Sequence, residues 1–388
     1  MSDQANHHRE TRWGGAAHAV SAGRAPPVTM ADAATRGLPV GEIAPAHRFD
    51  VAALDQYLRA LIPDLGEGLD VHQFQGGASN PTFLLVTHVG EDFKRYVLRK
   101  KPPGVLLATA HQVHREYAAM RALKDTDVPV PNARVLCQDT AIIGTDFYVM
   151  DYVPGRILMD ASLPGVSPTD RALIYDGFGA ALARLHQLDF RAVGLGDWAR
   201  PGDYIDRQLS RFTKQYRAAE TGRIAAMEVL IESLPKAAPP NRRTAIVHGD
   251  FKLGNMIFHP SEPRLMAVLD WELATIGDPL ADVAFSALPW HRGASGAAVL
   301  AQSGAGSGIP SETDYVRAYC RRTNREAIVG WNFYLAFAMF RLASIMQGVY
   351  RRVLDGTVAS NFAAVNQAPD LAERALATLN DESLREIG

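Results

Sequence analysis

The chain has 388 residues and a formal net charge of −2, and 47% of its residues are hydrophobic and 21% charged. This balance is that of a soluble globular protein, and it excludes a broad nucleic-acid-binding surface, which needs a clear excess of Lys and Arg. The length exceeds that of most single hydrophobic cores, so two lobes or domains are expected. Because only two cysteines are present, Cys137 and Cys320, we expect no disulfide framework and a cytoplasmic location.

The first 48 residues mix His, Arg, Glu, Gly and Pro without an apolar block. They lack the hydrophobic region of a secretory signal, so we expect a disordered tail over residues 1–48. A transit peptide is disfavoured because no amphipathic helix is evident. The longest apolar stretch, residues 333–340, ends at Arg341 and is far too short to cross a bilayer. We therefore expect no association with a membrane.

Residues 49–153 predict a small lobe of mixed helix and strand. Asp50 is placed to cap a first helix. Strand-like runs follow over residues 71–74, 82–89, 95–100, 133–137 and 147–152, the second and third joined as a hairpin. A helix over residues 110–124 is inserted before the fourth strand. Five strands with one inserted helix make a compact α+β lobe.

The pattern becomes helical after Pro154 and Gly155, which we interpret as a hinge before a second lobe over residues 154–388. Ser167 and Pro168 begin a helix. Its expected core stripe is Leu173, Ile174, Phe178, Leu182 and Leu185. Further helices are predicted over residues 204–219, 223–234, 315–322, 330–354 and 371–380, with short strands over 245–247, 256–258 and 265–269. Residues 293–308 predict a flexible loop. The whole predicts a two-lobed, protein kinase-like α+β fold.

The strongest chemical signal lies between residues 248 and 270. Asp250 follows a predicted strand in a His-Gly-Asp turn, Asn255 lies five positions later, and Asp270 directly follows a buried strand. A kinase needs an Asp that accepts or orients the substrate hydroxyl, with an Asn oxygen and a second Asp on Mg²⁺. We therefore predict Asp250 as the catalytic base and Asn255 and Asp270 as metal ligands. Capping and turn roles explain each residue alone, but explain the spacing of all three less well.

Five neighbours of this motif have supporting or open roles. We predict that His248 holds the turn by hydrogen bonds rather than acting as a nucleophile or base. Lys252 either contacts the transferring phosphate or the substrate, or it is a solvated lysine. Glu272 is either a metal-site carboxylate or a surface one. Asp278 is expected to cap the next helix, and Asp282 to point back and hold the backbone of the turn.

A phosphate clamp is predicted in the first lobe. Arg99 ends a strand on the same face as Val97, and its planar fork suits phosphate oxygens. Glu116, on the following helix, is the carboxylate expected to hold this cation. The alternative is that Arg99 and Glu116 are two unrelated solvated charges.

Two further segments are candidates for nucleotide contacts. Gly76, Gly77 and Ser79 lie between the first two strands, and their small side chains would let backbone N–H groups approach phosphates. An ordinary β-turn gives the same pattern, and no Gly-x-Gly-x-x-Gly is present. Asp151 and Val153 precede the hinge, where backbone groups would meet an adenine edge in a two-lobed kinase.

These residues resemble the aminoglycoside phosphotransferase and choline kinase-like superfamily over about residues 50–355. The runs VLRKKPPG from Val97 and VLDWELATIGDP from Val268 look like a narrower branch, the kinase-like domains associated with acyl-CoA dehydrogenases. The superfamily implies ATP, Mg²⁺ and a small-molecule hydroxyl acceptor. The branch implies a CoA-linked acceptor, such as a 4-hydroxyacyl-CoA, and an acyl-CoA dehydrogenase in the same pathway. A eukaryotic-type protein kinase is disfavoured, because its HRD and DFG motifs are absent.

Our hypothesis from the sequence is an ATP- and Mg²⁺-dependent small-molecule O-phosphotransferase acting on a hydroxyacyl-CoA or related hydroxy acid. The residues proposed for the acceptor pocket are Trp290, His291, Tyr334 and Arg341, although core packing and an ion pair explain them equally well. The first rival is an aminoglycoside or other small-alcohol phosphotransferase. It is disfavoured because the second lobe carries many arginines, among them Arg321, Arg322, Arg325, Arg351 and Arg352. The second rival is a non-catalytic nucleotide-binding module.

Overall fold

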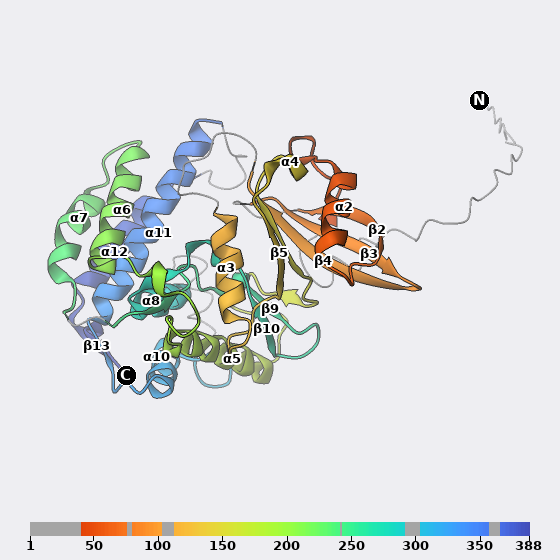
Figure 1. Ribbon diagram of the computed structural model, residues 1–388. Helices are drawn as coiled ribbons and strands as arrows, with labels where there is room; N and C mark the ends of the chain where they lie inside the picture. The colour runs from red at the N-terminus through yellow and green to blue at the C-terminus, as the bar shows by residue number, and fades with distance from the viewer. Residues whose placement is uncertain (1–39, 76–79, 103–111, 241–242, 292–302, 357–364) are drawn as a thin grey trace, which may run out of the picture.

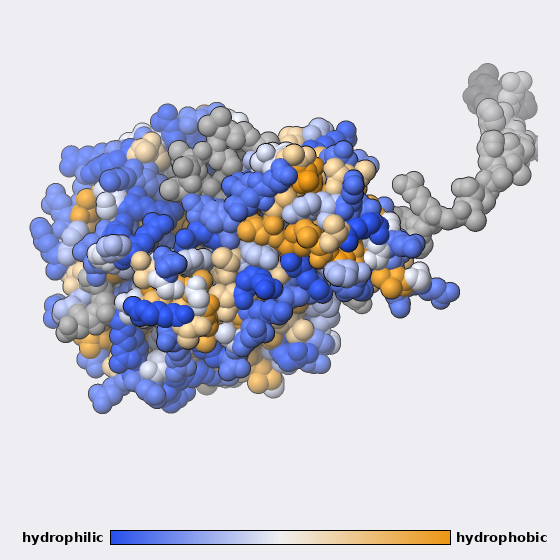
Figure 2. All heavy atoms as spheres, viewed as in Figure 1, coloured by the Kyte–Doolittle hydropathy of each residue, from blue (hydrophilic) through white to orange (hydrophobic). Residues whose placement is uncertain are grey.

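The computed structural model describes residues 40–75, 80–102, 112–240, 243–291, 303–356 and 365–388. Two lobes lie side by side, one built on an antiparallel sheet and the other mainly helical (Figure 1). Hydrophilic residues cover most of the face shown in Figure 2. The two-lobed α+β fold predicted from the sequence is therefore confirmed.

The first lobe contains a six-stranded sheet in the order β1-β2-β3-β4-β6-β5, in which every neighbouring pair is antiparallel. The strands are β1 (Val40–Gly41), β2 (Glu67–Phe74), β3 (Thr82–Val89), β4 (Asp92–Lys100), β5 (Ala133–Cys137) and β6 (Phe147–Asp151). The prediction of five strands was wrong by one. The additional strand, β1, lies in the segment assigned to the tail. Two residues at a sheet edge are too few to show an alternating pattern.

For the helices, the sequence predicted the one that Asp50 caps and one inserted helix, which is one fewer than the described part of this lobe contains. The structure has α2 (Val51–Leu61), α3 (Val113–Leu123) and the single-turn α4 (Thr140–Ile143). Asp50 caps α2 as expected, because its Oδ1 accepts from the Ala53 amide at 3.0 Å. Helix α2 packs on the sheet through Leu54 and Leu58, which are fully buried. The expected start of α3, near residue 110, lies outside the described residues.

Strand β4 carries its two terminal cations on opposite faces, as alternation requires. Arg99 pairs in register with Tyr148 of β6 and faces the second lobe. Lys100 is buried on the other face, with its Nζ 5.5 Å from the ring centroid of Phe49 and 5.9 Å from that of Phe83. The sheet therefore places Arg99, and not Lys100, on the side that faces the second lobe.

The second lobe is mainly helical, with short strands between the helices. Its helices are α5 (Pro168–Gln187), α6 (Tyr204–Ala218), α7 (Ala225–Ala237), α8 (Pro279–Ala287), α10 (Glu312–Arg322), α11 (Trp331–Leu354) and α12 (Ala368–Leu379). Its strands are β7 (Arg156–Ile157), β8 (Ala245–Val247), β9 (Met256–Phe258), β10 (Leu265–Val268), β11 (Thr275–Gly277), β12 (Ile328–Val329) and β13 (Glu386–Ile387). The strands missed from the sequence, β7 and β11 to β13, have two or three residues each, too few for a periodic signal.

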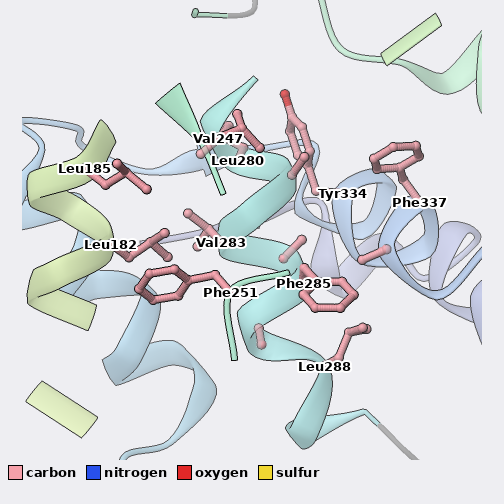
Figure 3. Packing of buried hydrophobic residues seen from close by; sticks show 14 of the residues in the cluster. Leu182, Leu185, Val247, Phe251, Leu280, Val283, Phe285, Leu288, Tyr334 and Phe337 are labelled. Atoms are coloured by element: carbon pink, nitrogen blue, oxygen red, sulfur yellow. The ribbon is translucent and has the colours of Figure 1, made fainter. Parts of the chain in front are cut away.

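Helix α8 forms the centre of this lobe and is buried at all nine positions. Figure 3 shows its Val283 facing Leu182 of α5 and Phe251, which directly follows Asp250. Leu182 and Phe251 are fully buried. The expected core stripe of α5 holds except at Leu173, which is 51% exposed. The turn of residues 248–250, which carries the predicted base and is called the catalytic turn below, is therefore anchored in a packed core.

Gly155 explains why the chain can leave the first lobe where it does. A Cβ added there would lie 2.2 Å from Ile257 Cγ2 and 2.3 Å from the Phe258 carbonyl oxygen. The hinge backbone thus passes directly against β9, whose preceding turn carries Asn255. Only glycine permits this approach.

Helix α11 is long and apolar enough to cross a membrane by length and composition alone. However, 72% of its most apolar window is buried inside the protein, and it packs against α6, α8 and α12. Core helices of globular proteins meet the same criteria, so the placement is that of a core helix.

Truncation of the α5 core should test this packing. We expect Leu182→Ala to lower the free energy of unfolding by about 2–5 kcal/mol, because it opens a cavity beside Phe251. Leu173→Ala, on the exposed side of the same helix, should change it by less than about 0.5 kcal/mol. Urea denaturation of both variants makes the comparison, and equal effects would contradict the described orientation of α5.

Candidate active site

The catalytic turn has a backbone shape that its sequence requires. Gly249 adopts φ +86°, and a Cβ there would lie 2.9 Å from both the Cβ and the carbonyl oxygen of Leu273. A residue with a side chain would be strained and would collide with the neighbouring loop. Phe251 fixes the other side of the turn, with its ring centroid 5.0 Å from that of Phe178. Asp250 is thus presented from a rigid loop.

The buried carboxylate of Asp282 holds this turn, as the sequence predicted. Its Oδ2 accepts from the His248 amide at 2.6 Å and its Oδ1 from the Gly249 amide at 2.9 Å. His186 Nε2 lies 3.5 Å from Oδ2, a contact without hydrogen-bond geometry. Burial alone would raise the pKa of the Asp282 carboxyl, but His186, His248 and the Gly249 amide outweigh it and lower the pKa. Asp282 therefore remains a charged acceptor for the amides of His248 and Gly249.

His248 has the structural role that the sequence favoured. The side chain is fully buried, and its Nδ1 accepts from the Asp250 amide at 3.1 Å. Nδ1 therefore carries no proton, and Nε2 donates to the Leu269 carbonyl oxygen at 2.9 Å. The ring ties the catalytic turn to the strand end before Asp270, where it cannot act as a nucleophile.

The Asp250 carboxylate lies at the surface of the turn and is oriented by two side chains. Its Oδ2 accepts from Asn255 Nδ2 at 2.8 Å and from Lys252 Nζ at 2.7 Å. Asn255 Nδ2 also donates to the Asp250 carbonyl oxygen at 2.9 Å. Lys252 is exposed, so its pairing with Asp250 is open to competition by a ligand. This environment suits a carboxylate that orients a substrate hydroxyl.

Asp270 stands in an unusual backbone conformation. Its φ of +66° and ψ of 55° are left-handed, which costs a residue with a side chain roughly 1–3 kcal/mol and occurs at functional sites. The preceding residue, Leu269, donates its amide to the Asn255 carbonyl oxygen at 2.8 Å. The two predicted metal ligands thus lie on directly hydrogen-bonded segments.

Arg99 links the two lobes at this point. Its Nη1 lies 3.3 Å from Glu116 Oε1, and its Nη2 donates to Asp270 Oδ1 at 2.9 Å. Glu116 is 1% exposed and also accepts from the Tyr148 hydroxyl at 2.6 Å. The predicted pairing of Arg99 with Glu116 is confirmed, and the alternative of two solvated charges is wrong. The contact with Asp270 was not foreseen.

Burial is the largest influence on the pKa values of both Glu116 and Arg99. It raises the pKa of the Glu116 carboxyl to about 7, although Arg99 and the Tyr148 hydroxyl oppose the rise. Burial would lower the pKa of Arg99, but Glu116, Tyr148 and Asp270 outweigh it and raise the pKa. Arg99 therefore remains a cation, whereas the charge of Glu116 depends on pH near neutrality.

The donor set of the loop fits a hard divalent cation such as Mg²⁺. The amide nitrogen of Asn255 is used on Asp250, which leaves its Oδ1 as an oxygen ligand. Asp270 Oδ1 is used on Arg99, and Oδ2 makes no hydrogen bond within the described residues. Carboxylate oxygens of Glu116, Asp270 and Glu272 also lie within 4.8 Å of one another. Of these acids, Glu116 is committed to Arg99, and Glu272 accepts from Asn80 Nδ2 at 3.3 Å.

The remaining predicted nucleotide contacts are only partly described. Gly76, Gly77 and Ser79 lie outside the described residues. The Asp151 side chain pairs with Arg134 at 2.6 Å, and its amide donates to the Asn132 carbonyl oxygen at 2.9 Å. An adenine edge could therefore be met at Asp151 only by its carbonyl. Val153 remains a prediction.

The four residues proposed for an acceptor pocket do not form one. Trp290 and Tyr334 are buried in the core, and the Tyr334 hydroxyl donates to Asp278 Oδ2 at 2.7 Å. Asp278 also caps α8 as predicted, because its Oδ1 accepts from the Leu280 amide at 3.0 Å. His291 pairs with Glu312 at 2.7 Å. Of the four, only Arg341 borders the catalytic turn.

Surface ion pairs account for two of the arginines that the sequence placed in this lobe. Arg322 pairs with Asp176 at 2.5 Å, and Arg351 with Asp355 at 3.1 Å. These two arginines therefore need no ligand to explain them.

Sequence reasoning missed several residues of the site. Tyr148 of β6 donates to Glu116, and His186 of α5 lies beside Asp282. Both come from elements distant in sequence, so no local pattern marks them. Arg115 was also missed. Its guanidinium lies 4.0 Å from the Trp198 ring centroid and donates to the Ala274 carbonyl oxygen at 3.1 Å. This contact docks α3 on residues 270–274, the metal loop, which carries the predicted ligand Asp270.

This geometry is that of a kinase-like phosphotransferase. Its fold matches an aminoglycoside phosphotransferase in ternary complex with ADP and hygromycin B, with a TM-score of 0.54 over 83% of this chain and 98% of that one. At 17% identity this likeness concerns the fold alone. Residues 70–319 match the phosphotransferase enzyme family, and the chain belongs to that family.

Three more similar proteins are one further phosphotransferase structure and two relatives with a different name. A crystal structure from Ralstonia eutropha, provisionally named an aminoglycoside phosphotransferase, has a TM-score of 0.76 and 44% identity over 86% of this chain and 98% of that one. Acyl-CoA dehydrogenase family member 10 of Mus musculus is 46% identical over 83% of this chain and 30% of its own length. Family member 11 of Homo sapiens is 42% identical over 89% of this chain and 45% of its own length. The chain thus spans less than half of these two relatives.

The raised pKa of Glu116 predicts a pH-dependent stability. Because its folded value of about 7 lies above the ordinary 4.5, its stabilising contribution is fully present below about pH 4.5 and is lost as the pH rises through 7. The loss is about 3 kcal/mol at most. The difference in unfolding free energy between wild type and Glu116→Gln, from urea denaturation between about pH 5 and 8, should fall as the pH rises. A pH-independent difference would contradict the raised pKa.

Proposed function

We propose that the protein is an ATP- and Mg²⁺-dependent kinase that phosphorylates a hydroxyl group of a hydroxyacyl-CoA or related hydroxy acid. The observation that carries phosphotransfer is the arrangement of Asp250 and Asn255. One amide nitrogen orients the catalytic carboxylate while the same side chain keeps an oxygen for a metal ion. Family membership supports the same reaction class.

In this reaction the Asp250 carboxylate accepts the hydrogen of the acceptor hydroxyl and aligns its oxygen with the γ-phosphorus of ATP. A bond forms between that oxygen and phosphorus, the bond to the β,γ-bridging oxygen breaks, and ADP leaves. The hydroxyl proton passes to Asp250 and then to solvent. Arg99 stabilises negative charge on the phosphates from the first lobe. Mg²⁺, held by Asp270 and Asn255, would neutralise further phosphate charge.

The acceptor class rests on the relatives. This chain is more than 40% identical to parts of two proteins named acyl-CoA dehydrogenases, which supports an acceptor from acyl-CoA metabolism and a dehydrogenase acting in the same pathway. Two buried free thiols, Cys137 and Cys320, are compatible with the proposed cytoplasmic location.

Two rivals receive less support. An aminoglycoside acceptor is suggested by the name of the Ralstonia eutropha protein, but that name is provisional. A non-catalytic nucleotide-binding module would have no need to keep Asp250 oriented between Asn255 and Lys252.

Substitutions of the two aspartates should separate chemistry from binding. We expect Asp250→Ala to lower turnover by about 10²–10⁴-fold while ATP binding persists, because the residue touches the acceptor hydroxyl and not the nucleotide. Asp270→Ala should instead abolish Mg²⁺-dependent nucleotide binding. Steady-state turnover and calorimetric titration with a non-hydrolysable ATP analogue measure the two effects. An Asp250→Ala enzyme with full turnover would overturn the mechanism.

The acceptor is tested by an ATP-consumption screen over hydroxyacyl-CoAs, free hydroxy acids, aminoglycosides and choline-like alcohols. We expect turnover on one of the first two classes. Asp250→Ala serves as the control for background hydrolysis. Turnover on aminoglycosides alone would refute the proposed acceptor, and turnover on none would refute the kinase assignment for these classes.

A further inference from the structure

Arg341 is a buried cation beside the catalytic turn. It is 5% exposed, and one of its terminal nitrogens donates to the Gly249 carbonyl oxygen. Its guanidinium carbon lies 4.8 Å from the ring centroid of Phe285 and 5.4 Å from that of Phe212. Among the described residues, no carboxylate lies within ion-pair distance of Arg341, and its buried Nε has no hydrogen-bond partner. A buried charge left so incompletely paired is costly.

Two buried acids of the same lobe are engaged elsewhere. Asp282 uses one oxygen on the His248 amide and the other on the Gly249 amide. Asp278 accepts from the Leu280 amide and from the Tyr334 hydroxyl. Both are committed to holding α8 and the catalytic turn, so neither is a direct counter-ion for Arg341.

Arg341 borders a small cleft between helix α6 and the two loops of the active site. The cleft volume is about 20 Å³, room for one water or the end of a carboxylate group. Gly249 of the catalytic turn and Leu273 of the metal loop form one side, and Gln208 and Arg211 of α6 the other. Its lining contains two arginines and an amide, and no acid.

Arg211 adds a second positive charge at the mouth of this cleft. By surface area the residue is exposed, although its guanidinium end is crowded. That crowding, followed by repulsion from Arg341 and Arg200, lowers the pKa of Arg211. No described acid lies within ion-pair distance of Arg211. Two like charges facing one cleft are stabilised when an anion binds between them.

We propose that Arg341, Arg211 and Gln208 form an anion subsite that binds a carboxylate of the phosphate acceptor. This proposal rests on the proposed function, and it narrows the acceptor to a hydroxy acid whose anionic group lies near the reacting hydroxyl. A planar guanidinium matches a carboxylate through two parallel hydrogen bonds. Polycationic acceptors are repelled by the same arginines.

A CoA thioester offers the subsite a different anion. Thioester formation removes the carboxylate charge, and the CoA phosphates are separated from the acyl chain by the long pantetheine arm. The cleft is lined by Gly249, the residue before Asp250, and the proposed reaction places the hydroxyl at Asp250. A free acid therefore satisfies the geometry better than a CoA phosphate does, and the two sources of anion can be distinguished experimentally.

The first experiment measures binding alone. Sodium 3- and 4-hydroxypentanoate and their neutral primary amides are compared by ligand-observed NMR, with Mg²⁺ and a non-hydrolysable ATP analogue present. We expect the salts to bind at least about tenfold more tightly than the amides, and Arg211→Gln to remove most of that difference. Lys214→Gln, which removes one exposed positive charge from the same helix outside the cleft, should retain it.

Three outcomes of this experiment would overturn the subsite. The first is equal binding of salts and amides, or no binding of the salts. The second is an equal effect of Arg211→Gln and Lys214→Gln, which would indicate general attraction by the surface charge. The third is a 4-hydroxypentanoyl-CoA that binds more tightly than the acid and loses affinity in Arg211→Gln, which would assign the subsite to a CoA phosphate.

The second experiment separates this proposal from the proposed function. Phosphorylation of the same compounds is followed by ATP consumption, and we expect Arg211→Gln to raise the KM for the acid about tenfold with little change in the KM for ATP. Salts that bind through Arg211 without being phosphorylated would support the subsite and count against the kinase activity. Neutral alcohols phosphorylated as efficiently as the acids would support the kinase and refute the subsite.

Discussion

The ion pairs of Arg99 are the interaction on which the two-lobed site depends. One guanidinium contacts Glu116 from the first lobe and Asp270 from the second, so the phosphate clamp and the metal loop share a single cation. Asp270 makes this contact from a left-handed backbone position. Removal of the cation would leave a buried carboxylate, Glu116, without its charge partner, which is more costly than the pair is stabilising. In the proposed reaction, nucleotide phosphates and Asp270 would compete for the same donor, which would couple nucleotide binding to the position of the loop that carries Asp270.

The turn that carries Asp250 is fixed by a second buried network, built from other side chains. Asp282 anchors two amides, His248 connects the turn to the strand end before Asp270, and Phe251 inserts into the core around α8 (Figure 3). Each contact uses backbone groups or a packed ring, so the turn remains in place without a ligand. In the proposed reaction, preorganisation of this kind would let Asp250 meet a hydroxyl without rearrangement.

Charge explains how a common phosphotransferase scaffold would be directed to a particular acceptor. The face of the catalytic turn that meets α6 and α11 is bordered by arginines and an amide, whereas a polycationic antibiotic would require acids there. The same buried arginine also supports the Gly249 carbonyl. In the proposed subsite, acceptor specificity and the geometry of the turn would therefore be linked through Arg341, a link that the surface arginines of this lobe do not have.

The sequence alone predicted the two-lobed fold, the approximate extents of most helices and the grouping of Asp250, Asn255 and Asp270, because periodic apolar patterns, capping residues and motif spacing are local properties of the chain. It also identified Glu116 as the partner of Arg99 and Asp282 as the support of the turn. Only the tertiary structure decided that Asp270 joins the Arg99 pair, that Tyr148 and His186 belong to the site, and that Trp290 and Tyr334 are core residues. It alone placed Arg341 beside Arg211. Contacts between segments far apart in sequence depend on how helices and strands pack, and no local pattern encodes that packing.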